Sequence, residues 1–351
     1  MVTRVGLLGL GEAAGSIWVP ALNKASGVEL VGGADPDPGA VGRMARLDPR
    51  VPVHEDLDQL LEAHRSIDWV VIATPPATHA ALAVQALEAG KHVLVEKPFA
   101  PSRAEADRVL AAAVAADRHL AVNHEMTWMP MLSEPLARIA RSQHGRLRFA
   151  QVWQTVSTQG GAAWRADGRT MAEFGTHAVD LLMAAFDETP EAVLAAMPRP
   201  DGATGDPVDL VTLFFSGGRA GHIVLDRLCQ GVHRYLECRF DCNSASLRSS
   251  MGGKASVSLG LDPRTRRPSV QLDVARGGQA WVEVGSERTV IARNPTSALA
   301  DATRRHLEAL LGDVAAGREP RTSGRRARAV VSVVEAAYRS AEQGRRVAVE
   351  P

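Results

Sequence analysis

The stretch Val5–Gly15, VGLLGLGEAAG, decides the fold of the first part of the chain. Its apolar run, 5–10, predicts a buried strand, and the glycines predict a tight turn that opens a helix. Similar strand-like runs follow at 28–34, 69–74, 92–97 and 119–123, with alanine-rich helical stretches between them. One such helix is expected to begin after Ser102, which has Glu105 three residues later in a capping-box arrangement. Strands that alternate with helices in this way indicate an α/β domain with a doubly wound parallel sheet.

The glycines of this stretch have the spacing Gly9-x-Gly11-x-x-Ala14, which is the dinucleotide-binding fingerprint in its expected strand–turn–helix context. Glycines let the backbone approach a pyrophosphate, whose charge then faces the helix N-terminus. The second strand ends at Asp35, whose carboxylate can accept hydrogen bonds from both ribose hydroxyls and would repel a 2′-phosphate. We therefore expect NAD rather than NADP; the alternative is that Asp35 is a plain loop residue before Pro36.

After Asn123 the pattern changes. Helical spacing is present at 132–141, 171–186, 297–316 and 324–343, and strand-like runs at 146–156, 209–216, 220–228, 234–241, 269–274 and 280–284. These features indicate an α+β domain with a mostly antiparallel, open-faced sheet. We expect an NAD(P)-binding Rossmann domain over 1–123 and a substrate-binding and oligomerisation domain over 124–351, whose closing helix can pack back on the first. Because an open sheet needs a cover, we expect a homodimer or homotetramer.

Composition narrows the class of protein. A chain of 351 residues is long for one core, and 45% apolar with 23% charged residues is typical of a soluble globular protein. A net charge of zero gives no basic surface for nucleic acid or anionic lipid, and no run approaches the ~20 apolar residues of a membrane span. Three cysteines without paired spacing favour free thiols, so we expect a cytoplasmic protein.

The stretch His92–Ala100, HVLVEKPFA, combines a buried strand with a charged end. Pro98 cannot donate to a sheet ladder, so the strand is expected to end at about Glu96, which leaves Lys97 at its carboxyl tip. Ligands bind at that end of the strands in open α/β sheets. The alternative is a solvated loop lysine.

The helical segment at 171–186 carries a second group of titratable residues. Glu173 and His177 are four residues apart and Asp180 is three further on, a spacing that shares one helix face. A carboxylate there can orient His177 and make it a competent base. Gly175 costs about 1 kcal/mol relative to alanine in a helix, which suggests that something approaches the backbone there. A solvated polar stripe is one alternative; a metal site is another, but no second His or Cys cluster supports it.

Together these motifs, with Asp35-Pro36, Thr74-Pro75-Pro76 and His79, and Glu96-Lys97-Pro98, resemble the glucose–fructose oxidoreductase / inositol dehydrogenase (Gfo/Idh/MocA) family over nearly the whole chain. The resemblance implies an NAD-dependent oxidoreductase that transfers hydride between a nicotinamide cofactor and a secondary alcohol of a sugar, cyclitol or related polyol. Two alternatives share the fingerprint: an NAD-dependent glycosidase that oxidises its sugar transiently, and a non-catalytic dinucleotide-binding protein of the same fold.

The resemblance also implies roles for residues. Lys97 would stabilise the alkoxide, His177 would take the hydroxyl proton, and Glu173 would orient His177 or bind the substrate. The implied cofactor contacts are Gly9, Gly11, Glu12, Ala13, Ala14, Asp35, Thr74, Pro75, His79, Glu96 and Lys97. The implied substrate contacts are Lys97, Asn123, His124, Trp164, Arg165, Glu173, His177 and Asp180, and no metal is implied.

This sequence departs from the family pattern around the substrate. The family commonly has Asp where Glu173 stands, and it commonly reads Asn-x-Arg-Phe-x-Pro where this chain has NHEMTWMP at 123–130. The Arg-Phe pair is therefore missing, and the candidates for the pocket are His124, Glu125, Trp128, Trp164 and Arg165. Packing is the alternative for the two tryptophans, and a surface charge is the alternative for Arg165. The resemblance thus implies family-like cofactor and proton chemistry with a substrate pocket of the chain's own.

Overall fold

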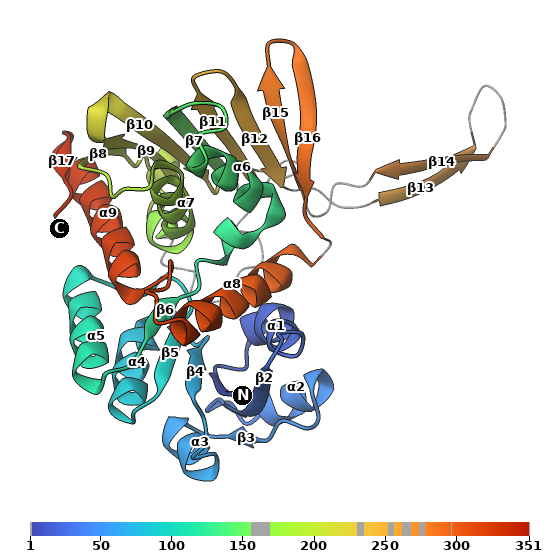
Figure 1. The fold of residues 1–351 in the computed structure, drawn as a ribbon, viewed down its shortest axis with the longest axis vertical. Helices are drawn as coiled ribbons and strands as arrows, with labels where there is room; N and C mark the ends of the chain where they lie inside the picture. The colour runs from blue at the N-terminus through green and yellow to red at the C-terminus, as the bar shows by residue number, and fades with distance from the viewer. Residues whose placement is uncertain are drawn as a thin grey trace. The chain divides into compact units, whose positions relative to one another are not determined.

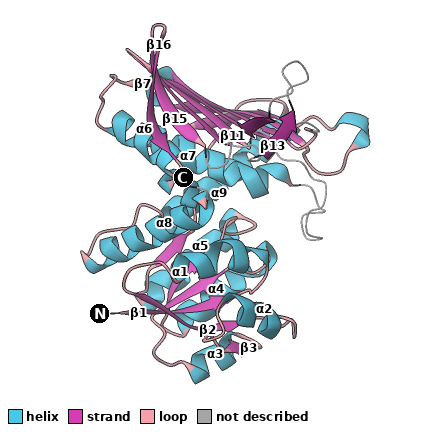
Figure 2. Cartoon of the chain, turned by 90° about the vertical axis from the view of Figure 1, so that its right-hand side faces the viewer, coloured by secondary structure: helices cyan, strands magenta, loops and turns pink. Residues whose placement is uncertain are grey.

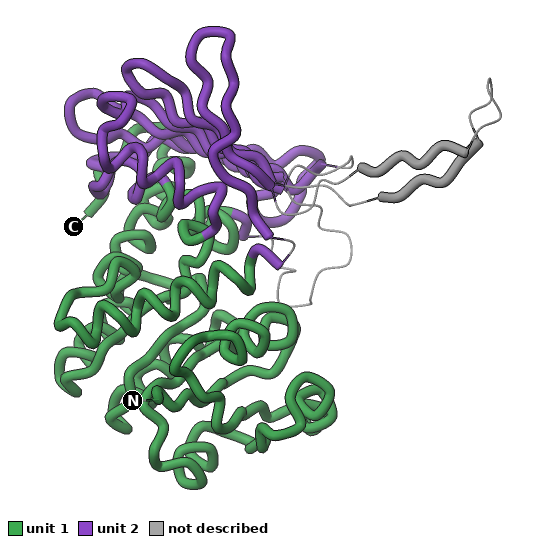
Figure 3. The backbone as a smooth tube through the Cα atoms, turned by 45° about the vertical axis from the view of Figure 1, so that its right-hand side comes forward, with its two compact units in different colours: residues 1–128, 171–181, 299–351 green, residues 129–170, 182–298 purple. Residues whose placement is uncertain are grey.

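The computed structural model describes residues 2–155, 169–229, 235–251, 256–261, 268–273, 278–295 and 297–350. The chain forms two compact units, which Figure 3 colours separately. The first unit is assembled from three stretches of sequence, 1–128, 171–181 and 299–351, and the second from 129–170 and 182–298.

The first unit is built on a six-stranded parallel sheet. Its strands are β1 (Thr3–Leu8), β2 (Val28–Ala34), β3 (Val53–His54), β4 (Trp69–Ile72), β5 (His92–Val95) and β6 (Leu120–Val122), in the order β3-β2-β1-β4-β5-β6. This is the doubly wound order of dinucleotide-binding sheets, so the expected α/β fold is confirmed. The short strand β3 was not expected, because two residues carry no readable periodicity.

Helices cover both faces of this sheet (Figures 1 and 2). The helical segments are η1 (Ala14–Trp18), α1 (Val19–Leu22), α2 (Ala40–Leu47), α3 (Leu57–Ala63), η2 (Pro76–Thr78), α4 (His79–Glu88), α5 (Arg103–Ala116), η3 (Glu125–Trp128), α8 (Ala298–Ala315) and α9 (Gly324–Gln343). Alternate β4 residues enter different cores: Ile72 packs in the cluster with Val331 of α9, and Val71 in the cluster with Trp18. This alternation follows from the period of two in a strand. The expected Ser102 cap of α5 is confirmed by its bond from the Glu105 nitrogen, 3.2 Å.

The second unit is dominated by a larger sheet. Its strands run in the order β16 (Glu287–Arg293), β15 (Gln279–Val284), β12 (Ser246–Met251), β11 (Leu236–Cys242), β7 (Leu147–Thr155), β10 (Arg219–Asp226), β9 (Val208–Phe215) and β8 (Ala192–Ala196). Neighbours are antiparallel except β7 with β10, so the expected mostly antiparallel sheet is confirmed.

Shorter elements complete the described chain. They are α6 (Pro130–Ala140), the two short helical turns η6 (Pro200–Gly202) and η7 (Ser216–Gly218), the hairpin of β13 (Ser256–Leu261) and β14 (Pro268–Asp273), and β17 (Val347–Ala348). Helix α6 packs in the second unit, where the Ser249 hydroxyl donates to the Met131 carbonyl at 2.5 Å. None of the helices described here has both the length and the apolar character needed to cross a membrane.

Candidate functional site

The loop after β1 has the geometry of a phosphate cradle. Gly9 has φ +86°, and a Cβ there would lie 2.5 Å from the Ala73 carbonyl oxygen, so only glycine allows this close approach of two strand ends. A Cβ on Gly11, by contrast, would meet nothing within 4 Å. The helix begins at Glu12, and the first N–H groups of a helix have no partner inside it. The loop therefore leaves both space and donors for a pyrophosphate, and these residues fit a dinucleotide.

Asp35 lies where a ribose-binding carboxylate is expected, at the end of β2. Its Oδ2 accepts a 2.7 Å hydrogen bond from the Leu10 nitrogen, and its Oδ1 accepts one of 2.9 Å from the Asp37 nitrogen. The guanidinium of Arg43 lies 3.8 Å from Asp35 and 2.6 Å from Asp37. The sequence reasoning did not single out Arg43, although a cation soon after this strand is a known signal for cofactor preference.

A buried hydrogen-bond chain holds the carboxyl ends of β5 and β6. Oε1 of Glu96 accepts from Trp18 Nε1 (2.8 Å) and from Asn123 Nδ2 (2.9 Å). Since a carboxylate can only accept, the Asn123 oxygen must face His306 Nδ1 at 2.9 Å, which therefore donates. Burial lowers the pKa of His306 to about 3, so its other nitrogen accepts from Thr322 at 2.5 Å. Glu96 and Asn123, expected to contact cofactor and substrate, are thus bonded within the protein.

Lys97 lies just beyond this chain and reaches the 171–181 stretch. Its Nζ donates to the Glu173 carbonyl oxygen at 3.3 Å and lies 5.8 Å from the centre of the Phe174 ring. The ammonium group is only partly buried. The structure therefore brings together Lys97, Glu173 and the start of the helix that carries His177.

The helical segment itself differs from the expectation. Met171–Gly175 is a π-helix, η5, followed by α7 (Thr176–Phe186), so the spacing argument for an ideal α-helix does not hold across Glu173 and His177. Nε2 of His177 lies 4.0 Å from Oε1 of Glu125, while the expected role of Glu173, to orient His177 or to bind the substrate, stays a prediction. A Cβ on Gly175 would lie 2.5 Å from the sulfur of Met171, so the Met171 side chain closely approaches the backbone at this glycine.

Several buried polar atoms gather beside His177. Both ring nitrogens of His124, Oε2 of Glu125 and Nδ1 of His177 have no hydrogen-bond partner among the residues that the structure describes. All three side chains are buried, and the rings of His124 and His177 meet edge to face at 6.2 Å. A buried polar group without a partner costs about 1–3 kcal/mol, so this cluster is suited to a ligand with several hydrogen-bonding groups.

Burial also shifts the titration of these groups. It raises the pKa of Glu125 to about 8, and the nearby Glu96 carboxylate adds to that effect. Burial, together with Lys97 and His124, lowers the pKa of His177 well below its usual value, and burial lowers the pKa of His124. Both imidazoles are therefore neutral at pH 7, the form in which a histidine can accept a proton.

The remaining predicted residues have other surroundings. His79 is buried, with its ring nitrogens 2.8 Å from the carbonyl oxygens of Thr74 and Pro98, so it ties two loops together. Pro75 is exposed. Asp180 accepts a 2.7 Å hydrogen bond from Arg326 in α9. Burial raises the pKa of Asp180, but Arg326, His124 and Arg321 together hold that pKa below its usual value.

Three residues that were expected at the substrate pocket remain: Trp128 in η3, Trp164 and Arg165. Trp128 stacks on His306 with ring centres 5.9 Å apart, which supports packing. Trp164 and Arg165 lie outside the described residues.

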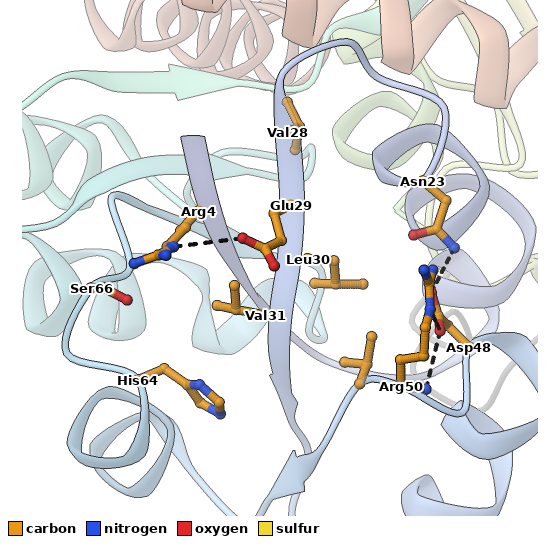
Figure 4. A pocket seen from close by; sticks show the side chains of 11 residues that line it. Arg4, Asn23, Val28, Glu29, Leu30, Val31, Asp48, Arg50, His64 and Ser66 are labelled. Carbon is orange, nitrogen blue, oxygen red and sulfur yellow. Dashed lines mark hydrogen bonds and ion pairs between the residues drawn. The ribbon is translucent and has the colours of Figure 1, made fainter. Parts of the chain in front are cut away.

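A separate hollow of about 560 Å³ lies at the starts of β1 and β2 (Figure 4). It is bordered by the Arg4–Glu29 ion pair at 3.6 Å and by Asp48, which Arg50 contacts at 2.7 Å. These are the amino ends of the strands, opposite to the end that carries Gly9, and ligands of doubly wound sheets bind at the carboxyl ends. Among the described residues, no group of three or more His, Cys, Asp or Glu side chains is placed to hold a metal.

Comparisons with known proteins agree with this geometry. Residues 3–124 match the family model GFO_IDH_MocA, described as an oxidoreductase family with an NAD-binding Rossmann fold. The chain is 26% identical over 302 residues to D-apiose dehydrogenase of Paraburkholderia graminis, covering 84% of this chain and 76% of that protein. It is 35% identical over 146 residues to 1-carboxy-3-chloro-3,4-dihydroxycyclohexa-1,5-diene dehydrogenase of Comamonas testosteroni, covering 42% of this chain.

A third relative is inositol 2-dehydrogenase 4 of Saccharopolyspora erythraea, 35% identical over 141 residues and 40% of each chain. The match spans only 36% of the Comamonas protein's length. Among solved structures, an oxidoreductase from Agrobacterium radiobacter in complex with NAD+, L-tartaric acid and magnesium has a TM-score of 0.82 at 19% identity over 99% of both chains. Residues 3–124 therefore match the NAD-binding Rossmann fold of the GFO_IDH_MocA oxidoreductase family, and the chain is similar to the dehydrogenases named above.

Proposed function

We propose that this protein is an NAD-dependent dehydrogenase that acts on a secondary alcohol of a sugar, cyclitol or related polyol. The observation that carries the proposal is the contact between Lys97 and the 171–181 stretch: Nζ of Lys97 lies 3.3 Å from the carbonyl oxygen of Glu173. It places a cation and a neutral imidazole in one part of the first unit, at the carboxyl ends of the strands. The names of relatives that act on apiose and inositol support the substrate class.

The cofactor would be held by the backbone of Gly9, Gly11, Glu12, Ala13 and Ala14, all in the loop and first turn after β1. Asp35 would bind the ribose hydroxyls, and the loop at Thr74 and Pro75 would border the nicotinamide. The dinucleotide, when bound, supplies the hydride acceptor. We propose NAD over NADP because the Asp35 carboxylate would repel a 2′-phosphate, and because Arg43 is already paired with Asp37.

The residues of this chain would handle the proton and the charge. The Lys97 ammonium would donate a hydrogen bond to the reacting oxygen and stabilise the negative charge that develops on it. His177, kept neutral by burial, would accept the hydroxyl proton. Glu173 and His124 would bind other hydroxyls of the substrate, since polyols offer several donors and acceptors to such groups.

We further propose that the second unit carries an oligomer interface. Its sheet exposes Trp153, Leu194 and Leu210, which are 46%, 42% and 39% accessible. Large exposed apolar side chains on one sheet mark interaction surfaces. A second copy of the chain would cover them in a homodimer or homotetramer, and light scattering on the purified protein tests this.

The dehydrogenase proposal is tested by following reduced-nicotinamide absorbance while the protein and NAD meet a panel of inositols, aldoses and sugar acids. A rise with one polyol is expected and would name the substrate class. Cleavage of a glycoside without net NADH would favour the glycosidase alternative instead. Failure to bind NADH at all, measured by quenching of tryptophan fluorescence, would contradict the cofactor assignment.

A further inference from the structure

We propose that Glu125 is the positioning residue of His177: it accepts a hydrogen bond from Nε2 of His177 and so leaves Nδ1 to take the proton of the reacting hydroxyl. The inference rests on the proposed dehydrogenase function and deepens it. It concerns the segment in which this chain departs from its family, where His124 and Glu125 follow Asn123.

The geometry gives each nitrogen of His177 a different surrounding. Nε2 lies 4.0 Å from Oε1 of Glu125, and both side chains are at most 5% accessible. Nδ1 has no hydrogen-bond partner among the described residues. When Glu125 is ionised its carboxylate can only accept, so in that form of the pair Nε2 carries the hydrogen and Nδ1 carries the lone pair. A contact of 4.0 Å is too long for a hydrogen bond, and such catalytic contacts tighten when substrate binds.

Glu125 is suited to this role because two other buried carboxylates of the first unit are already hydrogen-bonded. Asp180 is held by Arg326 at 2.7 Å, and Glu96 accepts from Asn123 at 2.9 Å. Oε2 of Glu125 is buried and has no hydrogen-bond partner in the described part of the chain. A carboxyl group in that state is free to approach an imidazole or to take up a proton.

The pair also explains how a buried histidine can work as a base. The hydroxyl O–H bond breaks, the proton goes to Nδ1, and the electron pair stays on oxygen beside the Lys97 ammonium. The imidazolium that forms at Nδ1 is disfavoured by burial, by Lys97 and by His124. The Glu125 carboxylate supplies the countercharge, and the second proton, on Nε2, is shared with Oε1.

The two groups then titrate as one dyad, and only its deprotonated form can accept the substrate proton. Glu96, Lys97 and Asp180 act on Glu125 from the neighbouring elements, and burial together with Glu96 raises the pKa of Glu125 to about 8. Alcohol oxidation should therefore rise with pH through an alkaline midpoint. Without the carboxylate, the midpoint should fall below that of an ordinary histidine.

The first test needs neither cofactor nor substrate. Long-range ¹⁵N NMR of histidine-labelled protein reports which nitrogen carries the hydrogen, and the His177→Gln variant assigns the signal. At a pH above the Glu125 pKa of about 8, we expect Nε2–H in the native protein. The same tautomer is expected in Glu125→Gln, whose amide oxygen still accepts, and a mixture of tautomers in Glu125→Ala. Glu134→Gln, which removes a carboxylate paired with Arg138, is the control and should leave the His177 signal unchanged. Nδ1–H in the native protein would overturn the proposal.

The second test is the pH profile of kcat/KM. Glu125→Gln should lower the maximal rate about 10–100-fold and move the midpoint to lower pH by more than one unit, with KM changed less than kcat. An unchanged midpoint in a folded Glu125→Gln protein contradicts the proposal. The NMR test does not depend on turnover. It can therefore disprove the Glu125–His177 pairing in a protein that is still an active dehydrogenase, and it can support the pairing in a protein that shows no dehydrogenase activity.

Discussion

The side-chain amide of Asn123 donates a 2.9 Å hydrogen bond to the Glu96 carboxylate, and its oxygen lies 2.9 Å from Nδ1 of His306. One side chain thereby joins β5, β6 and α8 in the buried interior of the first unit. Two residues that the sequence suggested as ligand contacts support instead the strand end that carries Lys97.

Asn123→Ala should therefore destabilise the protein. It removes one of the two donors to Oε1 of Glu96 and leaves Nδ1 of the buried His306 without a partner, at a cost of about 1–3 kcal/mol in the free energy of unfolding. Urea unfolding followed by circular dichroism measures this. Ser244→Ala, which removes an exposed hydroxyl bonded to the His144 carbonyl, is the matched control and should change stability by about 0.5 kcal/mol or less.

Lys97→Met should separate chemistry from cofactor binding. The thioether side chain keeps much of the length of lysine but cannot donate to the reacting oxygen, so kcat should fall about 10²–10⁴-fold. NADH binding, measured by fluorescence, should stay within a few fold of the native value. Turnover close to native in a folded variant would remove Lys97 from the mechanism.

Asp35→Asn should shift cofactor preference. The amide oxygen can still accept from the Leu10 nitrogen, whereas the bond from the Asp37 nitrogen and the charge that opposes a 2′-phosphate are lost. The ratio of kcat/KM for NADP to that for NAD should rise at least about tenfold, equivalent to about 1.4 kcal/mol. Adding Arg43→Ala should reverse much of that gain. An unchanged ratio would show that Asp35 does not face the ribose.

The two glycines of the loop should respond differently to alanine. Gly9→Ala combines a positive φ with a 2.5 Å approach to the Ala73 oxygen, so the unloaded protein should lose about 1–3 kcal/mol of stability. Gly11→Ala meets open space and should fold normally, yet it should weaken NADH binding because the methyl group enters the cradle. Thermal unfolding and NADH titration distinguish the two, and equal effects of both variants would argue against the cradle.

Glu125 should make stability depend on pH. In the folded protein its pKa lies at about 8, above its unfolded value near 4.5, so the folded state keeps a proton that the unfolded state loses. That contribution to stability is complete below the unfolded pKa and is lost as pH rises towards 8, at up to about 1.4 kcal/mol per pH unit. Glu125→Gln should be more stable than the native protein at pH 8 but not at pH 4.5. Parallel pH curves in urea unfolding would contradict this.

Local sequence signals predicted much of the first unit. The alternation that sends Val71 and Ile72 to opposite faces, and the Ser102 cap of α5, depend on residues close in sequence, and both are present. Pro98 likewise placed Lys97 beyond the end of β5. Such features follow from the period of a strand and from cap chemistry, which need no tertiary information.

The side-chain contacts inside the candidate site could not be predicted from the sequence in the same way. Glu125 and His177 are 52 positions apart, and Asn123 and His306 are 183 apart, so no spacing rule connects them. The spacing rule applied between Glu173 and His177 assumes a regular α-helix, but Met171–Gly175 is a π-helix. Propensity does not reveal such a turn, which tertiary packing imposes.

The order of the segments in the first unit has a consequence for synthesis on the ribosome. The sheet is complete in sequence by Val122, but its core also contains Ala327 and Val331 of α9. When β6 has just been synthesised, the part of the sheet that α9 will cover is still exposed. It stays exposed until more than two hundred further residues have been translated. Chaperone binding to ribosome-bound chains should accordingly persist until α9 has emerged, and a premature stop before Gly324 should damage the cofactor-binding unit although every fingerprint residue is present.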